Sequence, residues 1–450
     1  MSTAVRQAAE RLAGLVEAGI AEEPPAELVL RRLIGLVDPD IGVIRLLTDE
    51  GDYFPDEASF LTYRAELAAS GALSDGGYTA TSAVGGRALT RSDAVTGAVF
   101  EAYERYCLAI YRRDDLIGAS HVELVAAGET AVDPVRLAGW RPDSNGGRIA
   151  HETISWTRAY SVLLNRDIWV PSQLVHLPYR FEPDEPVLRE PLSTGTAAGL
   201  TRGAAVLRGL FEVVERDAAM LLHYLRLPTA ELSQETLADP ELAGMLNELA
   251  ARRLPARLLQ VDNGIGAAAV VARIDDPSGI GPAQVLGSKC ASEPAAAARG
   301  ALLEAATMRR ALRVRAERVR AGAEPYLADL SRIDSVDTRS NVWAQPELTG
   351  ALEYLVPGGN LTENAPHWRG TTGFVEDVLC SGGDILIADV TTPDVSALGL
   401  SVVKVIVPDL QPMHLSELRS SWTDRLLRFG CPPGTRRTPA DLNPVPHPFL

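Results

Sequence analysis

Apolar side chains recur at helical spacing in a long segment of the chain, residues 201–226. Its apolar positions are one, three, four or seven residues apart, which places them on one face of an amphipathic helix: Leu207, Leu210, Phe211, Val214, Leu221 and Leu222. We also predict helices over 3–19, 25–36, about 92–113 and about 293–320. Ser92-Asp93 is a suitable N-cap for the third of these helices.

Short apolar runs between turn residues predict strands. The runs at 385–390 and 402–407 are continuous and rich in β-branched residues, which indicates buried strands. Segments 154–164 and 168–177 are separated by Asn165-Arg166-Asp167 and predict a hairpin. Further strands are expected at 42–47, 257–262 and 267–274. Helices and strands together predict an α+β fold with mixed sheets and long helices.

Two segments rich in Gly, Ser and Thr precede predicted helices, residues 71–90 and 193–199, and we expect both to be loops. Small residues ahead of a helix expose backbone N–H groups that can bind anions. Neither segment matches GxxxxGK[ST], and no complete GxGxxG is present. Gly264-Ile265-Gly266 and Gly279-Ile280-Gly281 are expected to be turns, so a P-loop or a Rossmann site is not supported.

Composition narrows the class of protein. The chain has 450 residues, 46% hydrophobic and 23% charged, and a net charge of −16, which argues against a general nucleic-acid or anionic-membrane binder. The first 19 residues lack a hydrophobic signal core, and no apolar run is long enough to cross a bilayer. The four cysteines are far apart without a CxxC, so we expect reduced thiols and a cytoplasmic protein.

Two segments of the chain are nearly alike. Phe100-Glu101-Ala102-Tyr103-Glu104-Arg105 recurs as Phe211-Glu212-Val213-Val214-Glu215-Arg216. On a helix, residues three apart share a face, so each segment presents two mutually repelling carboxylates unless a cation binds them. Mg²⁺ bound to polyphosphate is such a cation, and the arginines that follow could bind phosphate oxygens. The alternatives are two ordinary solvated helix edges, or a pseudo-repeat.

The remaining candidate residues are less specific. The seven histidines show no HExxH, and no GxSxG occurs. Asp389 follows a predicted strand and is either a strand-end cap or a catalytic group. Residues 443–450 alternate proline with other residues, which favours extended polyproline II, so this tail is either a docked segment or a disordered end.

Taken together, these segments resemble the YcaO family over roughly residues 30–450. The resemblance rests on segments 100–105, 193–199, 211–217, 301–309, 389–394, 398–400 and 405–408, and on a tail with Pro444, Pro446 and Pro448 that is similar to the PxPxP end of the azoline-forming branch. The domains it implies are an N-terminal helical extension, 1–30, and a catalytic domain, 31–450.

The resemblance implies an ATP site without a P-loop, with Mg²⁺ as the metal. By position, the metal ligands would be Glu101, Glu104, Glu212 and Glu215. Nucleotide contacts would come from these four glutamates and from Arg87, Arg216, Glu304 and Arg309. The tail would help to organise the active site, where His447 or the terminal carboxylate of Leu450 would assist proton transfer.

The sequence departs from the family pattern at four positions. Arg87 stands where a lysine is common, Gly97 where a serine is typical, Leu200 where an asparagine is usual and Thr307 where a glutamine is usual. Leu200 and Gly97 cannot donate the same side-chain hydrogen bonds. These departures point either to rearranged nucleotide contacts or to weakened ATP binding.

The activity implied by the resemblance is ATP-dependent cyclodehydration of a ribosomally made precursor peptide, as in thiazole/oxazole-modified microcin biosynthesis. The expected partners are the precursor peptide and an E1-like leader-binding protein, because the chain shows no evident leader-binding domain of its own. A homodimer is also expected, and neither nucleic acid nor membrane. The alternatives are thioamide or amidine synthesis, and a degenerate, non-catalytic scaffold that binds peptide.

Overall fold

The computed structural model describes residues 2–24, 26–51, 54, 57–69, 71, 73–74, 83–139, 148–356 and 367–450. The chain divides into two compact units. Unit 1 comprises Met1–Glu50, Leu61–Val213 and Thr371–Leu410, and unit 2 comprises Gly51–Phe60, Val214–Gly370 and Gln411–Leu450. The division falls within one helix, α6 (Arg202–Leu225). Both units mix helices with antiparallel sheets, which confirms the predicted α+β class.

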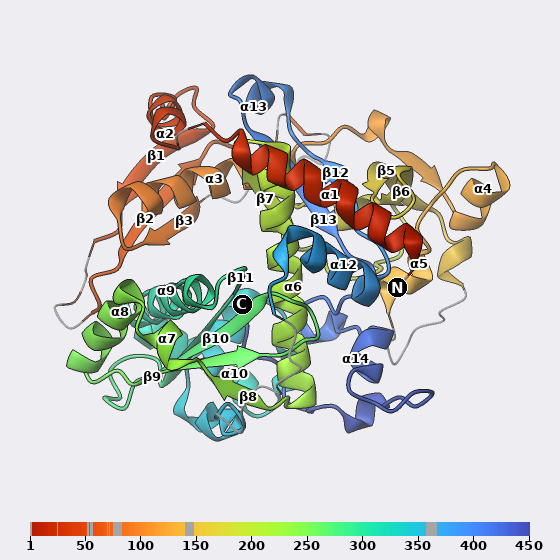
Figure 1. The fold of residues 1–450 in the computed structure, drawn as a ribbon. Helices are drawn as coiled ribbons and strands as arrows, with labels where there is room; N and C mark the ends of the chain where they lie inside the picture. The colour runs from red at the N-terminus through yellow and green to blue at the C-terminus, as the bar shows by residue number, and fades with distance from the viewer. Residues whose placement is uncertain are drawn as a thin grey trace. The chain divides into compact units, whose positions relative to one another are not determined.

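Unit 1 contains a three-stranded antiparallel sheet covered by a helix. Its strands lie in the order β1 (Ile44–Asp49), β2 (Leu61–Leu67) and β3 (Ala83–Ala88). Helix α3 (Arg91–Ala109) packs across β2 and β3 (Figure 1). The helix approaches so closely at Gly86 that a Cβ there would overlap the backbone of Ala94 and Ala98. The sequence therefore needs glycine at this crossing, and α3 is fixed on the sheet.

A second sheet in unit 1 draws its strands from three distant parts of the sequence. Its order is β4 (Ile117–Ala119), β5 (Ile154–Ser161), β12 (Leu386–Asp389), β13 (Ser401–Ile406) and β7 (Thr196–Gly199), with β6 (Arg166–Pro171) also paired to β5. All of these pairs are antiparallel. The predicted hairpin at 154–177 is confirmed as β5–β6, and the predicted buried strands near 385 and 402 are confirmed as β12 and β13.

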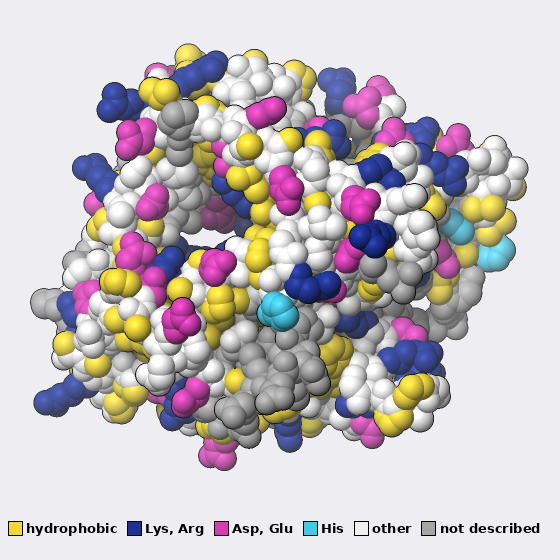
Figure 2. All heavy atoms as spheres, in the orientation of Figure 1, with side chains coloured by type: hydrophobic (Ala, Val, Ile, Leu, Met, Phe, Trp, Pro, Cys, Tyr) yellow, Lys and Arg dark blue, Asp and Glu magenta, His cyan; other side chains and the backbone are white. Residues whose placement is uncertain are grey.

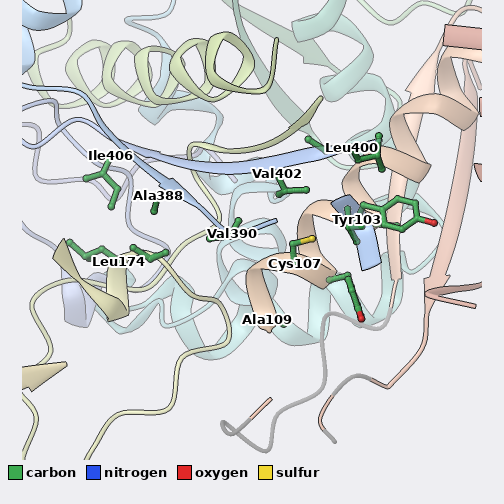
Figure 3. Packing of buried hydrophobic residues seen from close by; sticks show 14 of the residues in the cluster. Tyr103, Cys107, Ala109, Leu174, Ala388, Val390, Leu400, Val402 and Ile406 are labelled. Carbon is green, nitrogen blue, oxygen red and sulfur yellow. The ribbon is translucent and has the colours of Figure 1, made fainter. Parts of the chain in front are cut away.

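The core of unit 1 joins α3 to this second sheet. Figure 3 shows Tyr103 and Cys107 of α3 beside Leu400, just before β13, and Val402 within it. Burying each large apolar side chain contributes about 1.5–3 kcal/mol, which holds the helix firmly in place. The face of α3 that carries the acidic pair is therefore positioned against β13 and its neighbour β7.

Further helices complete unit 1: α1 (Thr3–Ala21), α2 (Ala26–Ile34), α4 (His121–Ala126), α5 (Pro134–Ala138), α12 (Gly370–Gly382) and α13 (Pro393–Ala397). The first two confirm the helices predicted at 3–19 and 25–36. Helix α1 packs against the beginning of α6, where Gly19 and Gly203 face each other without room for side chains. The predicted boundary between an extension and a catalytic domain at residue 30 stays a prediction.

Unit 2 is built around a four-stranded antiparallel sheet. The order is β11 (Gln284–Ala291), β10 (Ala268–Asp275), β9 (Ala256–Val261) and β8 (Thr229–Glu231). Helix α9 (Pro294–Arg313) packs across β10 and β11 (Figure 1), and a Cβ at Gly287 would overlap its backbone at Ala301. The other helices are α7 (Gln234–Leu237), α8 (Pro240–Ala251), α10 (Ala316–Leu327), α11 (Val336–Trp343) and α14 (Asp424–Arg428).

Several sequence-based expectations about elements are wrong. The segment 71–90 is not all loop, because 83–88 forms β3; residues 72 and 75–82 lie outside the described residues. The segment 193–199 ends in β7, which pairs with β13. Small residues are suited to both places because helices cross these strands closely. The predicted helix at 293–320 is two helices, α9 and α10, separated near Arg315.

The N-cap of α3 also differs from the prediction. Thr90, and not Ser92, has the extended backbone of a cap, and its hydroxyl accepts a hydrogen bond from the amide of Asp93. The helix ends at Ala109, four residues before the predicted end. Threonine and serine are both good caps, so spacing alone could not choose between them.

The tail forms part of the packed structure of unit 2. Pro446, His447, Pro448 and Phe449 are buried, so among the two alternatives the docked segment is correct. None of the helices among the described residues is long and apolar enough to cross a membrane. Figure 2 shows acidic and basic side chains interspersed on the face in view, without a continuous basic patch there.

Candidate functional site

Three of the predicted glutamates lie in unit 1 and form what we call the first carboxylate group: Glu101 and Glu104 of α3, and Glu212 of α6. Glu104 accepts a hydrogen bond from the amide of Ala198 at 2.8 Å, and Glu212 accepts one from Gly195 at 3.2 Å. Both amides belong to the small-residue segment that was predicted to bind anions. The segment therefore uses its N–H groups to orient carboxylates of the protein itself.

The electrostatics of the first carboxylate group favour a bound cation. Burial raises the pKa of Glu104 to about 8, and the carboxylates of Glu101 and Glu212 add to this rise, whereas the Ala198 amide opposes it. Arg105 pairs with Glu101 at 3.2 Å, as expected for residues four apart on a helix. Since three carboxylates lie close together, a divalent cation would relieve their repulsion.

The loop before β7 is held by a glycine and a lysine. Gly195 has a φ of +83°, and a Cβ there would overlap the carbonyl oxygen of Val405. Lys404 of β13 donates from Nζ to the carbonyl oxygens of Leu192 and Thr194, at 2.5 and 2.7 Å. Burial lowers the pKa of Lys404 to about 7, against the opposing effect of the Glu212 carboxylate. The sequence analysis did not identify this lysine.

The second carboxylate group lies in unit 2 and comprises Glu215 of α6 and Glu304 of α9. Ser288 of β11 contacts both: its amide donates to Glu304 and its hydroxyl to Glu215, each at 2.9 Å. The amide of Cys290 also donates to Glu215, at 3.3 Å. Glu215 is only 3% exposed, so these donors replace the water that the carboxylate loses.

Two cations accompany the second carboxylate group. Arg216 donates from Nη1 to the Ser288 hydroxyl at 3.4 Å and lies 3.6 Å from Glu215. Lys289 lies 3.6 Å from the other oxygen of Glu215, with a half-exposed side chain. The sequence analysis missed both Ser288 and Lys289, because it did not predict strand β11.

Two predicted nucleotide contacts lie in other surroundings. Arg309 is 3% exposed and donates to Glu57 at 2.6 Å and to Asp276 at 2.7 Å. Arg313 pairs with Glu57 as well, so Arg309 belongs to a buried ion-pair network of unit 2. Arg87 is exposed on β3 and not in a loop. The roles of Arg309 and Arg87 as phosphate contacts stay predictions.

The two predicted proton-transfer groups lie in the tail. His447 is fully buried, its Nε2 hydrogen-bonds to the carbonyl oxygen of His414, and Arg339 donates to its carbonyl oxygen. Burial lowers the pKa of His447 well below its ordinary value, so its imidazole is neutral at pH 7. Leu450 is partly exposed. Proton transfer by either residue stays a prediction.

Near the tail, a cluster of His414, Glu417 and His447 has potential metal-ligand atoms within 4.8 Å of one another. Arg339 donates to the Glu417 carboxylate and is itself fully buried. The Arg339 guanidinium therefore already supplies the positive charge that this carboxylate requires. A metal ion bound by the cluster would be repelled by this guanidinium.

The structure also gives local roles to two residues singled out in the sequence, Asp389 and Gly97. Asp389 accepts hydrogen bonds from the amide and the hydroxyl of Thr391, the arrangement of a strand-end cap. Gly97 of α3 faces Gly86 of β3, and a Cβ at Gly97 would meet the Gly86 Cα at 3.3 Å. The close helix–strand crossing thus gives a packing reason for a residue without a side chain at this position.

The donors of both carboxylate groups suit Mg²⁺. Carboxylate oxygens are the hard ligands that this ion prefers, and each group fixes them through backbone amides. No soft ligand contributes a side-chain contact to either group in the described contacts, since Cys290 donates to Glu215 through its backbone. The residues present therefore fit Mg²⁺ together with a polyphosphate.

Comparison with known proteins shows which family and which sequences this chain resembles. A family model described as YcaO cyclodehydratase, ATP- and Mg²⁺-binding, matches residues 85–411. An uncharacterized protein of Methanothermobacter thermautotrophicus is 27% identical over 345 residues, covering 74% of this chain and 82% of that protein. An uncharacterized protein in the tfuA 3′ region of Rhizobium leguminosarum bv. trifolii is 29% identical over 338 residues, covering 72% and 76%.

Solved structures share the fold at low identity. A heterocyclase in complex with substrate and cofactor matches with a TM-score of 0.71 and 22% identity; the match covers 95% of this chain and 57% of that one, so the chain spans little more than half of it. YcaO from Methanopyrus kandleri, bound with AMPPCP and Mg²⁺, gives 0.57 and 19%, covering 88% and 94%. The E. coli microcin synthetase McbBCD complex with pro-MccB17 bound gives 0.61 and 12%, covering 90% and 96%.

Proposed function

Because the chain belongs to the YcaO family of ATP- and Mg²⁺-binding enzymes, we propose that it is an ATP-dependent cyclodehydratase of a ribosomally made precursor peptide. The product would carry thiazoline or oxazoline rings made from Cys, Ser or Thr. One observation carries the proposal: both carboxylate groups are built from predicted glutamates, and backbone amides in or next to a neighbouring strand hold Glu104, Glu212, Glu215 and Glu304. The proline-alternating tail, packed in unit 2, supports the azoline-forming branch.

The proposed reaction activates a backbone amide. The side-chain thiol or hydroxyl of the substrate gives up its proton to a base and attacks the preceding carbonyl carbon, which forms a C–S or C–O bond and closes the ring. The resulting oxyanion attacks the γ-phosphorus of ATP, and ADP leaves. Phosphate then departs with the former carbonyl oxygen as the amide N–H loses its proton, which forms the C=N bond of the ring. Phosphorylation is needed because the oxygen would otherwise have to leave as hydroxide.

In this proposal the protein positions the reactants and balances charge, the main tasks in phosphoryl transfer. Glu101, Glu104 and Glu212 in unit 1 and Glu215 in unit 2 are the proposed Mg²⁺ ligands, and bound Mg²⁺ would supply positive charge to the phosphates. Arg216 would contact phosphate oxygens, helped by Ser288, which contacts both its guanidinium and Glu215. Glu304 would orient the nucleotide, and Arg87 and Arg309 are the remaining predicted contacts.

The tail would supply the proton acceptor. A buried neutral imidazole such as that of His447 can accept a proton only at an energetic cost, because burial disfavours its charged form. Leu450 is partly exposed, so burial would disfavour a charge on its carboxylate less than it does on His447. We therefore favour Leu450 over His447 for this role.

We further propose that the enzyme acts in the cytoplasm with two partners, its precursor peptide and an E1-like protein that binds the leader. A homodimer remains compatible with this arrangement. The comparison that supports a multi-protein assembly is the fold shared with a chain of the microcin synthetase complex.

The test is the mass of a modified peptide. A Cys-, Ser- and Thr-rich precursor is incubated with the enzyme, Mg·ATP and the leader-binding partner, and the Glu215→Gln variant serves as control. Ring closure removes the mass of one water per ring. A gain equal to sulfur replacing oxygen would instead identify a thioamide synthase, and incorporation of an amine would identify an amidine synthase. Unchanged peptide together with no calorimetric Mg·ATP binding would identify a scaffold.

Removing the tail separates binding from ring formation. We expect deletion of residues 444–450 to lower ring formation by about tenfold or more, because the proposed proton acceptor is lost. The affinity for Mg·ATP, measured by calorimetry, should change less. Equal ring formation by the trimmed enzyme would contradict the assignment to the azoline-forming branch.

A further inference from the structure

Lysine is almost absent from this protein. Of its 43 lysine and arginine residues, 41 are arginine, and the two lysines are Lys289 and Lys404. The two residue types carry the same charge but differ in shape: arginine has a planar fork of donors, whereas lysine has a compact, strongly hydrated ammonium. Ordinary surface ion pairs in this protein use arginine, as in Arg6–Glu10 and Arg428–Asp424. The two lysines therefore occupy exceptional positions.

Both lysines lie beside the carboxylate groups, one in each unit. Lys289 of β11 is 3.6 Å from Glu215 in the second group. Lys404 of β13 interacts electrostatically with Glu212 in the first group. No spacing in the sequence relates the two positions to the glutamates, so their placement is a property of the fold.

The surroundings of Lys289 leave its ammonium accessible. Its side chain is half exposed, and its stem runs along α9 at Gly300, where a Cβ would come within 2.7 Å of the lysine Cγ. The residues on either side, Ser288 and Cys290, donate to Glu215. Strand β11 thus presents a half-exposed point charge directly beside a buried, oriented carboxylate. A compact ammonium can bind a phosphate oxygen there without the two-point contact that a guanidinium makes.

Lys404, in contrast, is buried. Its side chain is 3% exposed, and its ammonium donates to the carbonyl oxygens of Leu192 and Thr194. These carbonyls lie just before Gly195, whose amide donates to Glu212. A guanidinium is larger and planar, so it would have to displace the 192–195 turn.

We propose that both lysines are functional members of the carboxylate groups, with different roles. Lys289 binds a phosphate oxygen of the nucleotide. Lys404 is a positioning residue that fixes the 192–195 turn, so that the Gly195 amide holds Glu212. This inference rests on the proposed ATP-dependent function.

The first test uses an acyl-phosphate derivative of ATP. A lysine ε-amine near the phosphates attacks the acyl carbon, an amide forms and ATP leaves, so the lysine is permanently marked. With two lysines and one α-amine in the chain, peptide mass mapping assigns the mark without ambiguity. We expect acylation of Lys289, prevented by excess Mg·ATP, and none at the buried Lys404. Acylation confined to the α-amine, or acylation of Lys289 that Mg·ATP does not prevent, would overturn the role of Lys289.

Calorimetry on the same sample separates this inference from the proposed function. If the wild-type chain with its partner binds no Mg·ATP, the proposed function fails. If it binds Mg·ATP but Lys289 stays unmarked, only the present inference fails.

Substitution gives the second test. We expect Lys289→Met to raise the KM for ATP about tenfold with little change in kcat, and Lys289→Arg to restore the KM only in part, because the guanidinium is a poorer fit. Lys404→Met should lower kcat and raise the Mg²⁺ concentration needed for half activity, each at least fivefold or so, since Glu212 loses its fixed orientation. Lys404→Arg should not rescue it.

Two controls keep the test decisive. Arg428→Lys changes an exposed ion pair far from both groups in sequence and should leave the kinetics unchanged. Acylation of Lys289 in the Lys404→Met variant, together with its circular dichroism, shows whether that variant is folded. Wild-type KM, kcat and Mg²⁺ dependence in both methionine variants would overturn the proposal.

Discussion

Both carboxylate groups hold glutamates through backbone amides, but they differ in how the negative charge of the glutamates is balanced. In each, backbone amides hold glutamates from two helices: the amides of Gly195 and Ala198, before and within β7, in unit 1, and those of Ser288 and Cys290 of β11 in unit 2. In the first group, burial and the neighbouring carboxylates of Glu101 and Glu212 raise the pKa of Glu104. Its three carboxylates outnumber the two cations beside them, Arg105 and Lys404. In the second group, Arg216 and Lys289 both lie beside Glu215, so its two carboxylates are matched by two cations. This difference indicates that a divalent cation matters most to the first group.

The two units share a topological arrangement, but the two similar sequence segments do not lie at equivalent places in it. In both units a three-stranded antiparallel meander is followed by a helix that crosses its last strand at a glycine: β1–β3 with α3, and β9–β11 with α9. The two nearly identical Glu-Glu-Arg segments do not follow this likeness. One lies in α3, after its meander, and the other in α6, before its meander. Their similarity therefore does not reflect an equivalent position in a repeated unit.

The largest expected effect comes from neutralising one glutamate in each group. Glu104→Gln and Glu215→Gln should each lower Mg²⁺-dependent ATP turnover by at least about 10²-fold, the scale of losing a group that stabilises developing charge. Turnover is measured by phosphate release. If only Glu104→Gln is inactive, the contrast between the groups becomes sharper, because the cation then depends on the first group alone. Full activity in both variants would contradict the metal assignment.

Glu104→Gln and Glu215→Gln should both leave the protein folded, which thermal unfolding can check. Glutamine keeps the shape of the side chain and its accepting oxygen, so the strand amides still find a partner. We expect thermal unfolding of Glu104→Gln to stay close to that of the wild type. Glu215→Gln, at a more deeply buried position, should be the less stable of the two.

The next effect concerns the two glycine crossings. Gly86→Ala and Gly287→Ala should each destabilise the protein by about 3 kcal/mol, because the new methyl group would overlap helix backbone that cannot move aside easily. Thermal or denaturant unfolding measures the loss. As matched controls, Gly118→Ala and Gly244→Ala add a methyl group with no atom within 4 Å. If the controls lose as much as the crossing variants, packing at the crossing is not the cause.

A smaller effect distinguishes the units by pH. Burial lowers the pKa of His223 to about 4 and that of His447 well below 6.5, both in unit 2, whereas only His176 shows such a shift among the described histidines of unit 1. The unfolded chain binds protons below about pH 6.5, when these folded imidazoles do not, so stability falls as the pH is lowered. From pH 7 to pH 5, each buried imidazole should cost about 2 kcal/mol.

Urea unfolding at the two pH values checks this expectation, with His223→Gln as the comparison. The variant should be less stable at pH 7, because His223 hydrogen-bonds to Tyr354 and to the tail at Val445. It should nevertheless lose less stability on acidification than the wild type. An identical pH dependence in the two proteins would show that His223 is not a source of acid lability.

The smallest effect compares the caps of α3 and α9. Thr90 caps α3 through its hydroxyl, so Thr90→Ala should cost about 1 kcal/mol. Glu293, at the N-cap of α9, makes no side-chain capping bond, so Glu293→Ser should stabilise the protein by about 0.5–1 kcal/mol. Opposite signs in thermal unfolding would support the contrast, whereas a loss in both variants would indicate that Glu293 has another structural role.

The sequence predicted the parts of the fold whose pattern is set by burial. Helix α6 and strands β12 and β13 have continuous apolar faces, and their predicted positions are close to the observed ones. Strands β3 and β7 were missed because they are rich in Gly and Ala, which weaken the strand pattern. Those small residues are needed where helices cross at short range, and the sequence gives no sign of the partner helix.

For the site, residue spacing identified the glutamates but not their hydrogen-bond and ion-pair partners. Ser288 was missed because strand β11 was missed, and the ion pairs of Arg309 with Glu57 and Asp276 join residues more than 30 positions apart. Lys289 and Lys404 could have been noticed from composition alone, because they are the two lysines among 43 basic residues. Their proximity to the glutamates, however, arises only from the tertiary fold.

The buried charges around Glu57 have a consequence for heat tolerance. Glu57, Arg309, Arg313 and Asp276 are almost wholly removed from water, at a cost in hydration free energy. Charged groups are hydrated with a strongly negative entropy, so that cost shrinks as the temperature rises, whereas the benefit of apolar burial levels off. On warming, this corner of unit 2 should hold together while regions that depend on apolar contacts alone begin to loosen.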